Sequence, residues 1–397
     1  MTDRLYYTDP YSLEFDANVR RVDAEDARTL VRLDRTFFYP TTGGQPFDTG
    51  TLDQHHVVDV FEDDHGDVIH VITSGTGALE AGQRVHGVVD GARRFDHMQQ
   101  HTGQHVLSAA FDRLFGVRTV SFHLGAAVST IDLAREMKHA ELQATEDAAN
   151  RVVWENRPIS VRFVSAEEAA RLPLRKEPVR GGTLRLIDVR DFDLSACGGT
   201  HVSHTGEIGI IAVTSWERFK GGQRIEFVCG RRALERMRLL RDSTARGAGL
   251  LSVQATELPD AIERLLADAR DQRKAQTALQ IDLARYRADE LSARAEPTPR
   301  GRVAAAAVDG DGGVLKNLAA AIVARPGFIA VLISNTRPAL IVVARSADVD
   351  LAANDLLARL VAKFGGKGGG KPDLAQGGGL SAEPGAILSE VTTLLSA

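Results

Sequence analysis

The chain has 397 residues, 43% hydrophobic and 25% charged, which is ordinary for a globular protein with two or three domains. Its net charge of −5 is uneven: the first 90 residues carry 7 Arg and no Lys against 17 Asp and Glu, so an anionic partner is expected to meet the later, net positive residues. No apolar run approaches about 18 residues, and two cysteines are too few for a disulfide framework, so we expect a cytoplasmic protein without a membrane partner.

Residues 1–90 are predicted to form a small β-barrel, with a sandwich as the other arrangement of such strands. Short alternating segments, such as 55–61 and 68–73, are separated by turn clusters rich in Gly, Asp and Thr. Residues 91–248 are predicted to mix helices and strands. The helical periods cover 92–115 and 138–155, and the expected strands cover 120–124, 128–133, 161–164 and 183–189.

The later residues are predicted to form a helical spacer and a separate α/β domain. Residues 257–293 contain no Gly and repeat apolar side chains at helical spacing, so residues 249–300 are assigned to the spacer, ending in a linker at 296–302. Residues 301–397 alternate strands and helices, with a glycine loop at 365–379 and a final helix at 383–395. The fold class expected for the whole chain is α+β.

Two pairs of potential metal ligands share a spacing of four residues. His101 and His105 lie on one face of the first predicted helix, and Cys197 and His201 follow 92 residues later. A thiolate with imidazoles suits tetrahedral Zn²⁺. Spacing leaves alternatives open, because an isolated pair is as often structural and because His97 and His101 would fit equally well. Thr102 stands where a metalloprotease helix carries Glu, which sets that class aside.

Five ordered motifs resemble those of the alanyl-tRNA editing proteins, relatives of the editing domain of alanyl-tRNA synthetase. The matching segments are Phe38–Pro46 with Asp48 and Gly50, His101–His105, Ser121–Gly125, Cys197–Val202 and Thr205–Gly209. The resemblance implies that His101, His105, Cys197 and His201 bind one Zn²⁺ per chain, which leaves His97 as a neighbour. Residues 365–377 resemble a glycine motif of the synthetase's C-terminal domain, so the resemblance covers essentially the whole chain.

The resemblance implies a hydrolase that deacylates tRNA(Ala) mischarged with serine, glycine or both, without ATP and without charging tRNA. A second, hydrolytic site is the usual remedy where sterics separate small amino acids too weakly. Zinc could activate water, orient the ester or hold the fold, because four protein ligands can close its shell. We assign no general base. The residues expected to bind substrate, from motif position, are Gly43, Gly44, Gln45, Gln104, Ser121 and His123.

Both glycines of residues 43–45 also fit an ordinary hairpin turn. The residues expected to contact tRNA are Arg224, Lys363, Lys367 and Lys371, although Arg224 could pair with Glu226 and the lysines could be a solvated cluster. Pro372 replaces the Ser or Thr of a P-loop, which argues against ATP binding. By resemblance, the C-terminal domain contacts tRNA away from the acceptor end, and with the spacer it supports a homodimer.

Two other functions remain open at the level of the sequence. One is a non-catalytic tRNA-binding protein whose zinc is structural, which the four-ligand set allows. The other is a DHH-type phosphoesterase, suggested by the C-terminal domain alone. Such an enzyme needs several Asp and His residues for two metals, and Asp96 followed by His97 is only a partial match.

Overall fold

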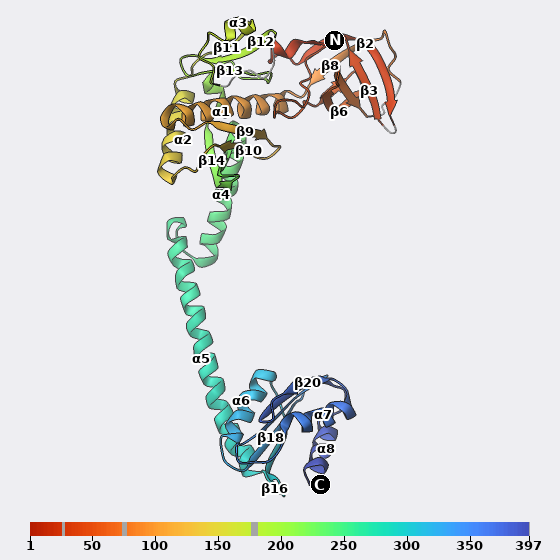
Figure 1. Cartoon of the computed structure of the whole chain (residues 1–397), viewed down its shortest axis with the longest axis vertical. Helices are drawn as coiled ribbons and strands as arrows, with labels where there is room; N and C mark the ends of the chain where they lie inside the picture. Colours follow the sequence, from red (N-terminus) through yellow and green to blue (C-terminus); the bar gives the residue numbers. More distant parts are fainter. Residues whose placement is uncertain (26–27, 74–77, 176–181, 397) are drawn as a thin grey trace. The chain divides into compact units, whose positions relative to one another are not determined.

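The computed structural model describes residues 1–25, 28–73, 78–175 and 182–396. The chain forms two compact units, Met1–Arg246 and Gly247–Ala397, and the boundary falls within helix α4 (Gly230–Leu251). Each unit has its own hydrophobic cores, and each is described separately below (Figure 1). Within the described residues, no helix is both long enough and apolar enough to cross a bilayer.

The first unit begins with a closed barrel, which confirms the predicted barrel over the sandwich. Inward and outward residues alternate along strand β8 (Arg84–Val89), where Val85, Gly87 and Val89 are buried and Arg84 and His86 are exposed. The short strands β1 (Asp3–Arg4) and β4 (Arg35–Thr36), with the 3₁₀ turn Leu5–Tyr7, lie outside the barrel. In spatial order the barrel strands are β2 (Glu14–Glu25), β3 (Arg28–Leu33), β7 (Val68–Ile72), β6 (His55–Glu62), β5 (Gly50–Leu52) and β8 (Arg84–Val89).

Helix α1 (Gly91–Phe115) follows the barrel directly, as the sequence predicts. The Asp90 side chain accepts the N–H groups of Ala92 and Arg93, and Gly116 ends the helix in the left-handed conformation. Figure 1 shows α1 between two sheets. One sheet has the order β14 (Ile211–Phe219), β15 (Gly222–Cys229), β10 (Ser129–Leu133) and β9 (Thr119–Leu124), and the other has β11 (Ile159–Val164), β12 (Leu184–Val189) and β13 (Asp193–Ala196).

Side chains of α1 tie these parts of the unit together. Helix α2 (His139–Trp154) packs beside α1, and Cys229 is fully buried in the same core. On the barrel side, the guanidinium of Arg94 forms a buried ion pair with Asp48 at 2.6 Å, and that carboxylate also accepts the Tyr39 backbone N–H at 2.7 Å. Arg94 also donates to Pro10 O and Phe37 O, and these hydrogen bonds offset part of the cost of burying the pair, which fixes the barrel against α1; Asp48 Oδ1 has no hydrogen-bond partner among the described residues.

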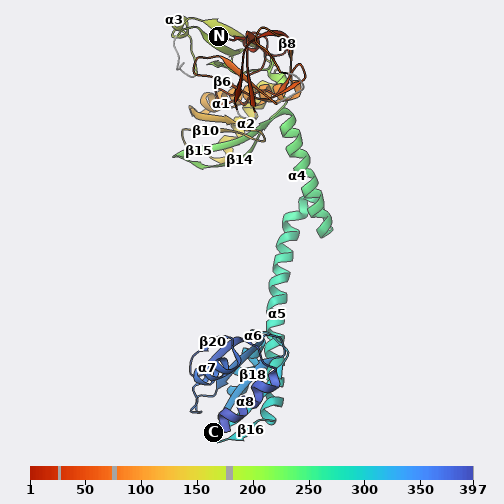
Figure 2. The same cartoon turned by 90° about the vertical axis from the view of Figure 1, so that its right-hand side faces the viewer.

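The second unit is a three-layer α/β structure (Figure 2). Helices α5 (Leu258–Ala293) and α6 (Gly312–Val323) pack on one face of its sheet, and α7 (Ala353–Phe364) and α8 (Pro384–Ser396) pack on the other. Consecutive residues of β18 are all buried because alternate side chains enter opposite cores. The sheet order is β16 (Glu296–Thr298), β17 (Gly301–Val308), β18 (Phe328–Ser334), β19 (Ala339–Arg345), β21 (Leu374–Leu380) and β20 (Lys367–Gly370).

Two predicted irregular segments of this unit are strands instead. Residues 296–302 are not a linker, because Glu296–Thr298 forms β16 and pairs with the start of β17. Residues 365–379 are not a loop, because they contain β20 and much of β21. A Cβ on Gly368 would lie 2.6 Å from Gly377 Cα, and one on Gly370 would lie 2.4 Å from Ala375 Cα, so these glycines permit close strand approach.

Candidate metal centre

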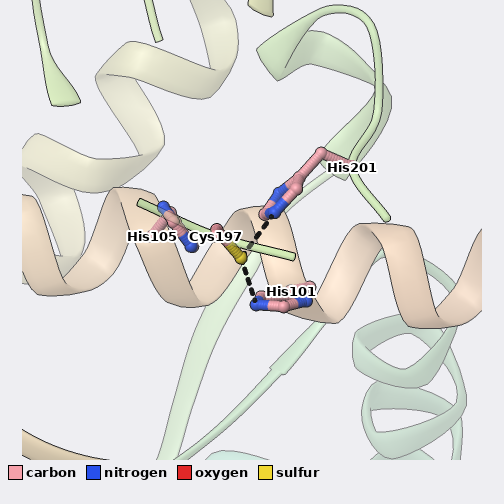
Figure 3. A group of neighbouring side chains, drawn as sticks. All are labelled: His101, His105, Cys197 and His201. Carbon is pink, nitrogen blue, oxygen red and sulfur yellow. Dashed lines mark hydrogen bonds between the residues drawn. The ribbon is translucent and has the colours of Figure 1, made fainter. Parts of the chain in front are cut away.

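The four predicted ligand residues gather at one point. His101 and His105 stand one turn apart on α1, and Cys197 and His201 approach from the segment after β13. One donor atom from each lies within 4.8 Å of all the others. The Cys197 Sγ is 3.4 Å from His101 Nε2 and 3.3 Å from His201 Nε2, with the side chains turned toward one another (Figure 3).

Glycine makes the approach of the second segment possible. A Cβ on Gly199 would lie 2.1 Å from Cε1 of His101 and 2.9 Å from the Gln45 side-chain oxygen. Any larger residue would therefore push the Cys197–His201 turn away from α1. The CGGTH spacing thus reflects a close contact between backbone and imidazole as well as the spacing of two donors.

Each imidazole is oriented by a partner on its Nδ1 atom. Gln45 Oε1 lies 2.7 Å from His101 Nδ1 and also accepts the Thr200 backbone N–H, so Gln45 Oε1 accepts the His101 proton. Thr102 donates its hydroxyl to Met98 O at 2.8 Å and can therefore only accept from His201 Nδ1, at 3.2 Å. With the proton on Nδ1, the Nε2 lone pair of each ring is free for a metal.

The third imidazole, His105, donates from Nδ1 to Asp193 at 2.9 Å. Asp193 is held in turn by Arg175, at 2.6 and 3.2 Å, and by the Ser195 hydroxyl. Burial by itself lowers the pKa of His105, but hydrogen bonds and charge from Asp193 and Cys197 raise that pKa to about 9. Burial raises the pKa of Asp193, yet His105 and Arg175 hold that pKa well below its ordinary range, so the carboxylate is ionised.

The donor set has the chemistry that Zn²⁺ requires. Burial opposes ionisation of Cys197, but electrostatic interactions and hydrogen bonds with the surrounding imidazole groups hold the pKa of its thiol well below its ordinary value, which favours the thiolate. A thiolate and three Nε2 atoms match a tetrahedral shell. His97 does not join this group, although it is buried one turn before His101. Burial, with the charges of Arg93 and Arg232, lowers the pKa of His97 to about 3.

A cavity of about 590 Å³ opens beside the cluster. His105 and Cys197 form part of its wall, and three arginines, Arg4, Arg175 and Arg185, form another part. Arg4 pairs with Glu62 at 3.0 Å and Arg175 pairs with Asp193. Sequence reasoning missed all three arginines and Asp193, because their sequence neighbours carry no metal or phosphate motif and only the tertiary fold brings them together.

The residues expected to bind substrate separate into two groups. Gly43, Gln104 and Ser121 line the cavity, with Ser121 donating to Asp132 and Gln104 donating to Ser108. The other three do not line it. Gly44 has φ +84° and a Cβ there would lie 2.7 Å from the Phe122 ring, Gln45 is buried against His101 and Thr200, and His123 is exposed on β9.

The residues expected to contact tRNA also differ in their surroundings. Arg224 donates to both oxygens of Asp132, at 2.7 and 2.9 Å, whereas Glu226 accepts from Ser215, so the pair with Glu226 that the sequence allowed is wrong. Lys363 pairs with Glu390. Lys367 on β20 and Lys371 just after it are exposed and have no ion-pair partner among the described residues. The second unit contains no His or Cys.

Three family models match parts of the chain. They are described as the threonyl and alanyl tRNA synthetase second additional domain (residues 184–226), tRNA synthetases class II (A) (residues 10–93) and the DHHA1 domain (residues 300–397). A crystal structure of the C-Ala domain from Aquifex aeolicus alanyl-tRNA synthetase aligns with 26% of this chain and 98% of its own, at 21% identity and a TM-score of 0.25.

Curated relatives match along 95% of the chain. Alanine–tRNA ligases from Pyrococcus abyssi and Methanoregula boonei are 33% and 37% identical, and this chain spans 42% of the length of each. The alanyl-tRNA editing protein AlaX-L from Pyrococcus horikoshii is 30% identical, and the match covers 94% of its length.

Proposed function

The chain belongs to the family of AlaX-L alanyl-tRNA editing proteins, and on that premise we propose that it hydrolyses tRNA(Ala) mischarged with serine or glycine. The reaction cleaves the ester between the amino acid and the terminal ribose, and water supplies the added atoms. It needs no ATP, and the chain acts in trans without charging tRNA. The observation that carries this proposal is the cavity of about 590 Å³ whose wall includes two of the four candidate metal ligands, His105 and Cys197.

The residues would divide the work as follows. His101, His105, Cys197 and His201 would hold one Zn²⁺ ion, which can polarise the ester carbonyl or lower the pKa of a water molecule. Gln45, Thr102 and Asp193 keep the imidazoles in the ligating tautomer. Gln104 and Ser121, in the cavity wall, present polar groups to the amino acid.

A polar group facing the serine hydroxyl separates serine from alanine better than size can, because alanine would leave that group unpaired. In this scheme Gln104 and Ser121 provide the polar surface, and Gly43 allows the backbone to approach the acceptor end. His123, which is exposed on β9, would act outside the cavity.

The decisive experiment compares purified full-length protein with its Cys197→Ala variant. We expect the native protein to hold one zinc per chain and to release serine or glycine from tRNA(Ala) faster than alanine. The Cys197→Ala variant should neither bind zinc nor release serine or glycine from the tRNA. The matched control is Cys229→Ala, which removes the other thiol from the core. Serine and glycine release that persists unchanged in zinc-free Cys197→Ala would refute metal-dependent hydrolysis.

The same experiment tests a structural zinc. If the native protein binds zinc and tRNA but releases no amino acid from any of the three esters, the chain is a tRNA-binding protein with a structural metal. The phosphoesterase alternative finds no support in the second unit, which lacks His and Cys and, among its described residues, gathers no cluster of metal-binding side chains.

Residues 249–300 would act as a helical spacer and residues 301–397 as a tRNA-binding domain, following barrel (1–90) and editing (91–248) domains. The exposed lysines of the glycine hairpin (residues 367–380, β20 and β21), Lys367 and Lys371, support phosphate contacts. Lys363 and Arg224, which have carboxylate partners, would contribute less.

A further inference from the structure

One row of side chains crosses the three-stranded sheet toward the metal centre. Phe163 on β11 is the direct cross-strand partner of Arg185 on β12. On the other side of Arg185, its carbonyl accepts the Cys197 backbone N–H at 3.0 Å. Directly opposed residues of antiparallel strands share a face, and strands lie about 4.8 Å apart, so the row spans about 10 Å from Cys197 to Phe163. All three residues line the cavity.

Among the described residues no carboxylate pairs with Arg185, a buried cation, although the charge of the Cys197 thiolate lies close enough to act on it. It is 8% exposed. Its Nε donates to Tyr7 O at 3.0 Å, and its Nη1 donates to Cys197 O and Gly199 O at 2.8 and 2.9 Å. Its Nη2 has no hydrogen-bond partner within the described part of the chain. A buried guanidinium in this state is costly and favours an anionic ligand.

The other charged groups of the cavity leave Arg185 as the group free to meet an anion. Arg4 is paired with Glu62, and Arg175 is paired with Asp193. Phe163, next to Arg185, lines the same cavity but is an exposed residue, with 50% of its surface accessible. An exposed aromatic ring beside a guanidinium is the combination that holds a single-stranded nucleotide, with the base stacked and the phosphate paired.

We propose that Arg185 and Phe163 form the subsite for the 3′-terminal nucleotide of the substrate, an inference that rests on the ester hydrolysis proposed above. Arg185 Nη2 donates to the phosphate of that nucleotide, and Phe163 stacks against a base. The ester, ribose, phosphate and base all belong to one nucleotide, so an ester held at Cys197 brings the other groups over the next two strands. The row therefore sets the distance between the metal centre, where the ester would be cleaved, and the side chains that bind the phosphate and the base.

The test measures binding of the trinucleotide CCA to zinc-loaded full-length protein by calorimetry. Phe163→Ala should weaken binding about tenfold, Phe163→Trp should preserve it, and Trp154→Ala should not change it. Trp154 is a matched control because it is an exposed aromatic residue, on α2, that does not line the cavity. Arg185→Gln should weaken binding at least as much, and Arg185→Lys should recover part of it.

Binding by Phe163→Ala and by folded, zinc-retaining Arg185→Gln at the native affinity would overturn the subsite, as would a native protein that does not bind CCA at millimolar concentration. A parallel kinetic measurement separates this inference from the function. Phe163→Ala should raise KM for seryl-tRNA(Ala) by a much larger factor than it raises KM for serine ethyl ester, which has no nucleotide. A native protein that binds CCA through Phe163 but cleaves no aminoacyl ester would retain the subsite and lose the proposed function.

Discussion

The side-chain amide of Gln45 orients the imidazole of His101, because its oxygen accepts the His101 Nδ1 proton. Thr200 in turn holds the amide in place. Its oxygen accepts from His101 and from the Thr200 N–H, and its nitrogen donates to the Thr200 hydroxyl at 2.9 Å. Sequence reasoning placed Gln45 among the substrate contacts from its position in the motif shared with the alanyl-tRNA editing proteins. The structure instead buries it completely behind the candidate ligand.

Removing this amide should weaken metal binding. Gln45→Ala leaves His101 free to rotate and to place its proton on either nitrogen, so we expect zinc affinity to fall about 10-fold to 100-fold. Competition with a chromogenic chelator measures the loss. Gln143→Ala, an exposed glutamine on α2, is the control and should leave affinity unchanged. Equal affinities for both variants would show that Gln45 does not position the ligand.

The candidate ligand residues could be nominated from the sequence, but their supports could not. Spacing of four residues puts His101 and His105 on one helical face and Cys197 and His201 in one segment, so local geometry was sufficient to nominate both pairs. It was not sufficient to separate His97 from His105, which only the three-dimensional grouping does. The hydrogen bond between Asp193 and His105 joins residues 88 positions apart, and that between Arg185 and Tyr7 joins residues 178 positions apart. No local sequence pattern predicts contacts of this range.

At the scale of elements, the barrel contains a histidine that titrates below neutral pH. His70 on β7 is fully buried, donates from Nδ1 to Val31 O and accepts from the Thr36 hydroxyl at Nε2. The Thr36 oxygen already accepts the Phe38 N–H. The neutral ring is therefore fully hydrogen-bonded, and burial lowers the pKa of His70 to about 4, against 6.5 in the unfolded chain.

The sign of the pH effect follows from this lowered pKa. Between pH 6.5 and 4 the unfolded state takes up a proton that the folded state does not, so stability present above pH 6.5 is lost as the pH falls, by up to about 3 kcal/mol. Thermal unfolding followed from pH 7 to pH 4.5 measures the slope. His70→Gln should flatten that slope even if it lowers the melting temperature at pH 7; an unchanged slope would assign the acid sensitivity to other groups.

The glycine hairpin shows where element prediction from sequence failed. Gly and Lys residues are typical of loops, so residues 365–379 were expected to be irregular, yet β20 and β21 pair along four residues. The glycines are needed because a Cβ on Gly366 would lie 2.5 Å from Gly378 O. Strand β20 forms the edge of the sheet and places Lys367 there, exposed to solvent.

Substitution of the hairpin lysines tests their role without disturbing this packing. Lys367→Ala with Lys371→Ala should weaken tRNA binding and reduce the slope of log affinity against log salt by about 1 to 2, because two phosphate contacts are lost. Filter binding at several salt concentrations gives the slope. Lys274→Ala, on the exposed surface of α5, is the control. An unchanged slope in the double variant would remove the hairpin from the tRNA interface.

At the scale of the whole molecule, the second unit leaves apolar side chains of α5 in solvent. Leu265, Leu266, Leu279, Leu283 and Tyr286 are each more than half exposed. In line with the homodimer that the sequence resemblance implies, we propose that the chain dimerises and expect sedimentation to give a dimer of the full chain at micromolar concentration. Leu279→Glu with Leu283→Glu should shift it to the monomer, because charges on this face oppose its burial. A native protein that sediments as a monomer would contradict the homodimer.

The position of Gln45 has a thermodynamic consequence. All four candidate ligands lie within residues 101–201, but the amide that holds His101 comes from the segment between two barrel strands. Occupancy of the proposed zinc site and integrity of the barrel should therefore be linked equilibria. Added zinc should protect the barrel against denaturant. Conversely, a substitution that creates a cavity in the barrel core should weaken zinc binding and release the metal into solution.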